Sequence, residues 1–504
     1  MREQNSYRQI LRSSSIIGGA SVLNILIGLV RTKVAAVLLG PAGVGLIGLL
    51  QSLMTTASTV SSLGFGTVGT RQIAEAVGEG DEAGVVVARR ALFWGTMGLA
   101  VIGAGAFWLL RGMLADKVLR NPSASVQIGW LAIGVALSVA AGSQTALLNG
   151  LRRIGDLARL SIASSLLTTL LATGALLWLE GAGLVLFVLA APISSFLLGH
   201  WFVGRIGRLD APATPFSALG QQWRAMAKLG AAFMVSGLMA TVGQLVVRTL
   251  VQRDLGAEAL GQFQAAWAIS MTCIGFVLGA MGTDYYPRLT AVIHDQDAAR
   301  RLVNEQTEVA LLLAGPALLA MLGLAPWVID LLYSSAFDQA VTILRWQVVG
   351  DLLKVVSWPL GFIILAAGDG RTFMFTETMA IGVFVVFTWI GLPLLGVQAT
   401  GVGFLVMYVA LLPLVYWLAW RRIGFYWPRR VVALILVLLV ASGAVFALGQ
   451  WSERGGGALG VLLAVVFGIY SLAQLGSKAK FGGRFGRVVE LIRNLMQKIG
   501  VPRG

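Results

Sequence analysis

The sequence has few residues of the types that build disulfides, metal centres and soluble surfaces. Of 504 residues, one is cysteine (Cys273) and two are histidine (His200 and His294). One cysteine excludes an internal disulfide and a cysteine-based metal cluster. The histidines lie far apart in sequence, so the chain offers little for a metal site. Charged residues make up only 12 %, against roughly 25 % in soluble domains.

The sequence also lacks the residues usually needed for nucleotide binding and for metal-dependent sugar transfer. The sequence contains no GxxxxGK[ST] loop for nucleotide phosphates, so any transport is not driven by ATP bound to this chain. It also has no catalytic dyad and no acidic cluster of the kind that holds a metal for sugar transfer. We therefore expect a protein that is not an enzyme, with no catalytic residues, no metal and no cofactor.

Apolar residues are abundant instead, at 57 % with a mean hydropathy of +0.81. A soluble core cannot hide this much apolar surface, and a membrane span needs roughly 20 apolar residues. The sequence predicts an all-α polytopic membrane protein. Fourteen candidate spans lie near 16–39, 44–66, 91–110, 126–149, 160–179, 182–204, 229–251, 259–283, 309–333, 340–367, 372–395, 397–420, 431–450 and 456–476.

The basic residues predict how the chain is oriented. If the polar N-terminal stretch is cytoplasmic and the first span is retained, 28 of the 38 Lys and Arg residues fall in cytoplasmic segments. This positive-inside bias indicates an even number of spans, both termini in the cytoplasm and a bacterial inner membrane location. Residues 481–499 have helical apolar periodicity with basic partners, which predicts an interfacial helix on the anionic leaflet. The alternative is a polar tail with chance spacing.

An internal repeat relates residue n to residue n + 216. Gly40 matches Gly256, and Gly45 matches Gly261. Further matches pair Gly66–Thr67 with Gly282–Thr283, Asp81 with Asp297 and Ala83 with Ala299. Six spans per copy give both copies the same orientation, which predicts two parallel six-helix bundles around a central cationic cavity. The expected parts are an N-terminal bundle (1–204), a linker (205–228), a C-terminal bundle (229–422), two extra spans (430–476) and a basic tail (477–504).

Charges inside spans are costly and usually face a cavity. Arg is suited to phosphate, Lys supplies a point charge, and Trp faces stack on sugar rings. These rules predict a binding site for an anionic, sugar-bearing ligand, made of Arg31, Lys33, Arg248, Arg345, Lys354, Arg71, Arg288, Trp346 and Trp358. Carboxylates in or near spans predict ion-coupling positions at Asp351, Glu377 and Asp284.

Structural roles are the alternative for several of these residues. Arg31 and Lys33 lie near the outer end of their span, where long basic side chains also reach the interface. Asp351 and Lys354 are three apart and either pair with each other or take part in function. Arg71 and Arg288 either contact the ligand or only fix the topology.

Two stretches resemble a known family. They are GPAGVGLIGLLQSL, which begins at Gly40, and RWQVVGDLLKVVSWPLGFIILAAGDGRTFMFTE, which runs from Arg345 to Glu377. Both are similar to the Wzx-type O-antigen and enterobacterial common antigen (lipid III) flippases of the multidrug/oligosaccharidyl-lipid/polysaccharide (MOP) exporter superfamily. The resemblance covers residues 10–422. The family typically has twelve spans, whereas peptidoglycan-precursor flippases of the same superfamily have fourteen.

The resemblance implies a flippase for undecaprenyl-pyrophosphate-linked oligosaccharide, such as an O-antigen-like or exopolysaccharide repeat unit. It implies alternating access, membrane lipids as surroundings, and a monomer docked to a polysaccharide polymerase and chain-length regulator. No nucleic acid partner is expected. Two other classes stay open: a drug/cation antiporter of the same superfamily, and a non-transporting membrane partner of a polysaccharide assembly complex.

Overall fold

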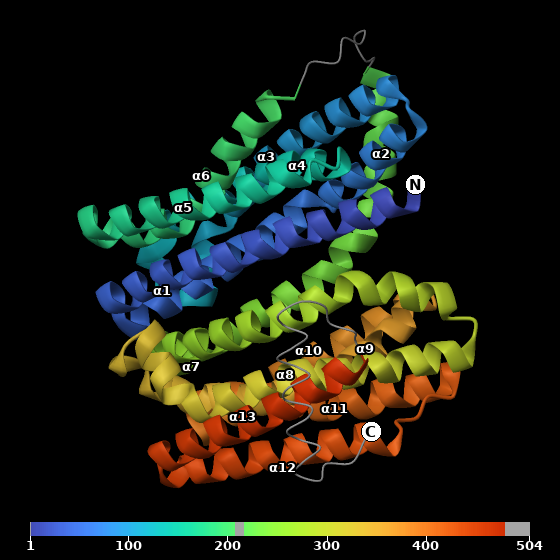
Figure 1. Ribbon diagram of the computed structural model, residues 1–504. Helices are drawn as coiled ribbons and strands as arrows, with labels where there is room; N and C mark the ends of the chain where they lie inside the picture. The colour runs from blue at the N-terminus through green and yellow to red at the C-terminus, as the bar shows by residue number, and fades with distance from the viewer. Residues whose placement is uncertain (1, 207–215, 479–504) are drawn as a thin grey trace. The chain divides into compact units, whose positions relative to one another are not determined.

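A computed structural model describes residues 2–206 and 216–478, and within these ranges the chain is helical with no strand (Figure 1). The first half contains α1 (Arg2–Ser62), α2 (Phe65–Glu79), α3 (Glu82–Leu119), η1 (Pro122–Ala124), α4 (Ser125–Gly150), α5 (Ile154–Trp178) and α6 (Glu180–Gly204). The second half contains α7 (Phe216–Val292), α8 (Gln296–Leu332), η2 (Ser335–Phe337), α9 (Asp338–Ala366), α10 (Gly370–Leu395), η3 (Gly396–Gln398), α11 (Ala399–Ile423), α12 (Arg429–Trp451) and α13 (Glu453–Lys478).

The all-α membrane architecture is confirmed. Among the described residues, eleven helical segments are long and apolar enough to cross a membrane. Three of them, Gly18–Ser62, Gly237–Gly279 and Gly370–Ile423, are 43 to 54 residues long, and each covers two of the predicted runs. The eleven segments therefore account for all fourteen spans. The predicted tail helix at 481–499 lies outside the described residues.

Two compact units make up the chain. Unit 1 holds the residues up to Gly261 together with Leu332–Ser334, and unit 2 holds the remainder. The sequence placed the division at the linker 205–228, whereas the contacts place it inside α7. In unit 1, α3 packs along α4 and α5 packs along α6; in unit 2, α9 packs against α11 and α12 packs against α13 (Figure 1).

Glycines at matching places bend the first long helix of each copy. Gly40 in α1 has φ 62° and ψ −169°, and Gly256 in α7 has φ 87° and ψ −179°. Residues with a side chain rarely adopt this conformation, so glycine is required. The two bends lie 216 residues apart, which is the offset predicted from the sequence. The expected outer turns are therefore sharp bends within otherwise continuous helical segments.

The glycines next to these bends bring the two copies into close contact within unit 1. A Cβ added at Gly45 would lie 2.5 Å from the Ala257 carbonyl oxygen and 2.6 Å from the Gly261 amide nitrogen. A Cβ added at Gly261 would overlap the Pro41 backbone. Gly45 and Gly261 are themselves a repeat pair. Small residues permit this backbone approach, as is common between membrane helices.

The copies differ immediately after this pair of spans. In the first copy the chain bends at Leu63 and Gly64, with φ of 44° and 68°, before α2 begins. Gly64 packs directly on Gly230 of α7. In the second copy, α7 continues without such a bend to Val292. The first copy therefore has a sharp corner that the second lacks.

Acidic residues cap the helices that begin in the loops. The Asp81 side chain accepts a hydrogen bond from the Gly84 amide at the start of α3, and Asp295 accepts from the Asp297 and Ala298 amides at the start of α8. Asp369 caps α10 by accepting from the Thr372 amide and hydroxyl and also pairs with Arg422. These hydrogen bonds, first those from Thr372, lower the pKa of Asp369 to about 2. The cap thus stays charged at neutral pH.

We expect Gly261→Leu to destabilise the protein, because the new side chain has no room beside Pro41. Overpacking of this kind costs about 1–3 kcal/mol. Thermal unfolding in detergent, followed by tryptophan fluorescence, should show a lower midpoint. Gly105→Leu is the control, because nothing lies within 4 Å of a Cβ at that position. Equal midpoints for the two variants would contradict the close packing.

Candidate functional site

Unit 1 contains three of the predicted intramembrane cations. Arg248 on α7 is only 5 % exposed, and its Nη1 donates a hydrogen bond to Gln244 Oε1 one turn earlier (3.2 Å). Lys33 on α1 is half-buried and its Nζ donates to the Tyr333 carbonyl oxygen (2.6 Å). Arg31 is half-buried on the same helix. Arg248 has the strongest case for a binding role, because it is the most deeply buried of the three cations and a guanidinium is suited to phosphate oxygens.

Unit 2 contains a buried carboxyl group at the predicted position. Asp351 on α9 is 1 % exposed, and its Oδ2 accepts a hydrogen bond from Ser270 Oγ of α7 (2.6 Å). Its other oxygen, Oδ1, is buried and has no hydrogen-bond partner within residues 2–206 and 216–478. Burying a carboxyl group is costly unless its oxygens find partners. The unsatisfied oxygen marks Asp351 as a position with capacity for an ion or a proton.

Lys354 lies one turn from Asp351 in an aromatic and sulfur-lined environment. Its Nζ is 3.6 Å from Met271 Sδ and 6.0 Å from the centroid of the Phe404 ring. The carboxyl groups of Asp351 and Glu377 are close enough to interact with its charge. Glu377 itself is exposed on α10. The charge of Lys354 therefore lies beside a methionine sulfur and an aromatic ring, with two carboxyl groups nearby.

An aromatic cluster in unit 2 supports this environment. The Trp267 ring stacks on Phe384 at 5.9 Å with an interplanar angle of 11°. Phe404 packs edge-on against Trp267, Phe384 and Tyr408. Gly350 on α9 leaves room for the Phe404 ring, which would lie 2.7 Å from an added Cβ. These rings fix the neighbourhood of Lys354 by close packing.

Arg345 and Trp346 turn toward α12. Arg345 is 4 % exposed, its Nη1 donates to the Gly449 carbonyl oxygen (3.0 Å), and Glu453 is near enough to interact with its charge. The Trp346 ring packs on Phe446 at 4.5 Å. The described contacts of both residues attach α9 to α12, a role that the sequence did not indicate.

The remaining predicted binding residues are two exposed cations and a tryptophan that lies one turn beyond Lys354 on α9. Arg71 pairs with Glu75 at 2.7 Å and Arg288 pairs with Asp284 at 3.1 Å, with all four side chains more than half exposed. Exposed pairs of this kind contribute little energy. Trp358 packs against Tyr285 and Phe362, with ring centroids 5.8 and 4.7 Å away.

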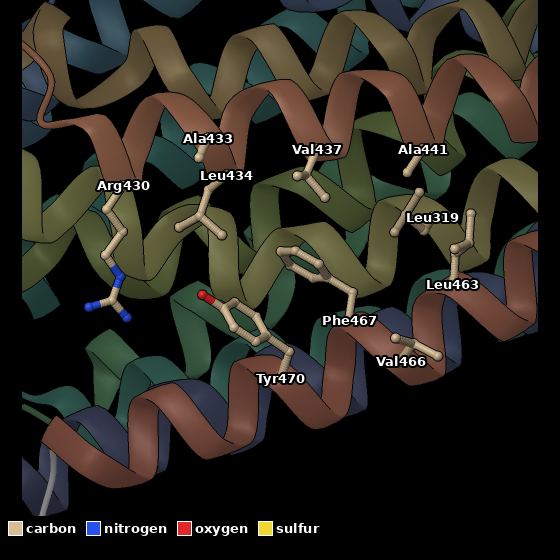
Figure 2. A pocket seen from close by; sticks show the side chains of 10 residues that line it. All are labelled: Leu319, Arg430, Ala433, Leu434, Val437, Ala441, Leu463, Val466, Phe467 and Tyr470. Carbon is tan, nitrogen blue, oxygen red and sulfur yellow. The ribbon is translucent and has the colours of Figure 1, made fainter. Parts of the chain in front are cut away.

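An apolar groove of about 380 Å³ runs between α8, α12 and α13 in unit 2 (Figure 2). Arg430 lies at one end, and the rings of Phe467 and Tyr470 on α13 point toward α12. Arg430 Nε is 3.1 Å from Glu308 Oε1, and the Arg430 guanidinium also donates to Gln474. The rest of the lining is aliphatic. The groove has the shape and chemistry to take a hydrocarbon chain.

The arrangement of the helices indicates a class of protein. Long apolar helices, a repeated pair of bent helices and buried charges within spans are typical of a transporter with internal repeats. Several solved structures have the same fold. An inward-facing multidrug resistance MATE transporter of the MOP superfamily aligns with a TM-score of 0.67 at 16 % identity, covering 82 % of this chain and 98 % of that one. The lipid II flippase MurJ in an inward closed conformation aligns at 0.63 and 10 % identity, covering 92 % and 99 %. These likenesses show the MOP transporter fold.

Sequence comparison identifies the family. A model of the polysaccharide biosynthesis protein family matches residues 10–292, more than half of the chain. The protein belongs to this family. The lipid III flippases of Escherichia coli (strain K12) and Shigella flexneri are each 22 % identical over 430 residues, which is 82 % of this chain and 99 % of each relative. The Wzx-type resemblance predicted from the sequence is confirmed.

Sequence reasoning missed the neutral partners of the buried charges. Ser270 and Gln244 hold Asp351 and Arg248, yet a single serine or glutamine in an apolar helix carries no distinctive pattern. Gln262 on α7 was also missed. It is 2 % exposed, donates to the Ala336 carbonyl oxygen and accepts from the Ala340 amide, which fixes the start of α9. A polar residue inside the predicted span 259–283 was the available signal.

We expect Ser270→Ala to destabilise the protein by about 1–3 kcal/mol, because it leaves both Asp351 oxygens without a donor. Thr272→Ala on the same helix is the matched control, since the Thr272 hydroxyl is exposed and bonds only its own helix at Ala268. Chemical unfolding in detergent measures both. A Ser270→Ala loss no larger than the Thr272→Ala loss would argue that Ser270 does not hold the carboxyl group.

Proposed function

We propose that the protein flips an undecaprenyl-pyrophosphate-linked oligosaccharide from the cytoplasmic to the periplasmic leaflet by alternating access. Family membership and the nearly complete coverage of two relatives named lipid III flippase support this function. The observation that carries it is Arg248, a guanidinium 5 % exposed within a membrane helix and hydrogen-bonded to a neutral glutamine. Such a group suits a lipid head that carries a double anion.

The pyrophosphate is the part of this ligand that needs cations. In unit 1, Arg31, Lys33 and Arg248 supply them, and in unit 2 Lys354 supplies one. A low-dielectric surrounding strengthens these attractions, which offsets the cost of removing the anion from water. Arg345 is less suited, because its guanidinium already contacts the Gly449 carbonyl oxygen. Arg71 and Arg288 are exposed and paired, so their role is limited to initial attraction.

The sugar and lipid parts need apolar and aromatic surfaces. Trp358 of unit 2 is suited to stack on a sugar ring, while Trp346 packs against Phe446. The groove between α8, α12 and α13 is suited to the polyprenyl chain, and Arg430 lies at one end of it (Figure 2). The two spans beyond the repeat would then keep the chain in lipid while the head group crosses.

Coupling to an ion is assigned to Asp351 first. It is the buried carboxyl group with an unsatisfied oxygen, and Glu377 lies near the same lysine. Asp284 is exposed and paired with Arg288, which makes it the weaker candidate. Flipping driven only by consumption of the product in the periplasm is the alternative, and the response of flux to an imposed proton or sodium gradient separates the two.

The protein is a multi-pass inner-membrane protein, and we place both termini in the cytoplasm on the basis of the positive-inside distribution. The proposed partners are a polysaccharide polymerase and a chain-length regulator on the periplasmic side. The proposed working form is a monomer.

Flux in proteoliposomes tests the function. A fluorescent polyprenyl-pyrophosphate oligosaccharide should be flipped by the wild type, and Arg248→Gln should slow it. A hydrogen bond to a charged group contributes about 1.5–3 kcal/mol, so the expected loss is about tenfold to hundredfold. Arg253→Gln is the matched control, because Arg253 lies on the same helix and is exposed.

Three results would contradict the proposal. Equal rates for folded Arg248→Gln and Arg253→Gln would remove Arg248 from the site. Export of an organic cation without glycolipid flux would favour the drug/cation antiporter. Loss of polysaccharide assembly in cells without any flux in vesicles would favour a non-transporting partner.

A further inference from the structure

Unit 1 contains a second, polar cavity that the proposed function does not use. It has a volume of about 310 Å³ and is lined by twelve described residues from α1, α2, α3, α4 and the corner before α2. Eight of the twelve carry a hydroxyl group: four on α1, two on α4 and one each on α2 and α3. None of the twelve is charged. Ligand cavities of this size are usually mostly apolar, so a neutral, hydroxyl-rich wall is unusual.

The corner at Leu63 and Gly64 creates this cavity. It turns the chain from α1 into α2, so that hydroxyls of both helices face the same space as those of α3 and α4. The close contact of Gly64 with Gly230 fixes the corner from outside. The cavity has depth: Thr96 and Ser143 are 3 % and 8 % exposed, whereas Thr55 and Thr67 are exposed.

The hydroxyl donors of the wall are largely used within the helices. Ser58 donates to the Met54 carbonyl oxygen, Thr59 to Thr55, and Ser62 to Thr59, at 2.8 to 3.0 Å. Thr96 donates to Leu92 (2.6 Å) and Ser143 to Ala140 (2.8 Å). A hydroxyl has one donor and two acceptor lone pairs. The wall therefore presents mainly uncharged acceptors to the cavity.

A wall of acceptors suits some parts of the proposed substrate better than others. A pyrophosphate group has only acceptors and negative charge, so it finds few donors and no cation among the residues of this wall. Sugar hydroxyls and the N–H of an acetamido group are donors, and they match a wall of acceptors. A uronic acid would bring a carboxylate into a cavity without a cation, which is costly.

The repeat shows that this wall is particular to the first copy. The offset of 216 pairs Ser138 with Lys354, Thr55 with Met271, and Gly142 with Trp358. The structure supports this register, because α4 ends at Gly150 and α9 ends at its counterpart Ala366. Lys354 and Met271 are in contact in unit 2. Equivalent positions therefore carry a lysine and a methionine in the second copy and hydroxyl groups in the first.

We propose that the hydroxyl-lined cavity of unit 1 binds an uncharged sugar residue of the transported glycan. The inference rests on the proposed function and adds a sugar subsite to it, separate from the cations that take the pyrophosphate. Its specificity is for neutral hexose or N-acetylhexosamine units over acidic ones.

Gly142 provides the sharpest test. It lines the cavity, and nothing lies within 4 Å of a Cβ added there. Gly142→Leu should fill the cavity without disturbing the helix, and Gly105→Leu makes the same exchange at an open position on α3 outside it. Thr96→Val removes one hydroxyl with little change of shape. The probes are chitotriose, which is uncharged, and a galacturonic acid trimer, titrated against the protein in nanodiscs by saturation-transfer NMR.

We expect wild type and Gly105→Leu to bind chitotriose at least about tenfold more tightly than the acidic trimer. Gly142→Leu should weaken chitotriose binding about tenfold or more, and Thr96→Val about threefold to tenfold. Equal binding of both trimers, or unchanged binding in folded Gly142→Leu and Thr96→Val, would overturn the proposal. If Gly142→Leu fails to fold, Thr96→Val decides alone.

Flux measured on the same proteins separates this inference from the function it rests on. If the wild type binds chitotriose through this cavity but flips no glycolipid, the sugar subsite stands and the flippase proposal fails. If glycolipid is flipped normally by Gly142→Leu and chitotriose does not bind, the flippase proposal stands and the subsite fails.

Discussion

Backbone hydrogen bonds must be satisfied inside the helices wherever lipid surrounds the chain, and the rest of the structure depends on this constraint. Non-helical backbone is then confined to positions where it can be accommodated, such as glycines. Gly40 and Gly256 bend the first long helix of each copy in the same way, and the glycines that follow them, Gly45 and Gly261, let the copies meet. The corner at Leu63 and Gly64 lies in the first copy, and α7 of the second copy has no such bend. This corner opens a polar cavity.

Buried charged groups in this protein also have hydrogen-bond partners inside the protein. Arg248 is held by Gln244, Asp351 by Ser270, and Arg345 by a carbonyl oxygen. These hydrogen bonds go to neutral groups and satisfy part of the hydrogen-bonding capacity of each charged group. Opposite charges lie nearby as well, with Glu453 close to Arg345 and Lys354 close to Asp351.

The sequence was sufficient for the class, the spans and the repeat, because these depend on composition and period. The offset between Gly40 and Gly256 even located the two bends. Side-chain direction was not predictable. Arg345 lies on the same helix as Asp351 and Lys354 but faces α12, since six residues carry it to a different side of the helix. Asp284 pairs with Arg288 on an exposed face. The hydroxyl-lined cavity was missed because its serines and threonines are spread over four helices, so no local pattern reveals them.

Divergence between the copies fits the chemistry of a lipid-linked glycan better than that of a single small cation. Such a substrate has a doubly anionic head, an extended part rich in hydroxyl donors and a long hydrocarbon tail. A symmetrical pair of sites would match none of these parts well. Here Lys354 in the second copy corresponds to Ser138 in the first, and an apolar groove lies mainly on α12 and α13, which the repeat does not include. Two copies that keep the same bends and the same close contact have thus acquired different linings. The shared backbone geometry suits the alternating access proposed above, and the unlike linings suit the three parts of the proposed substrate.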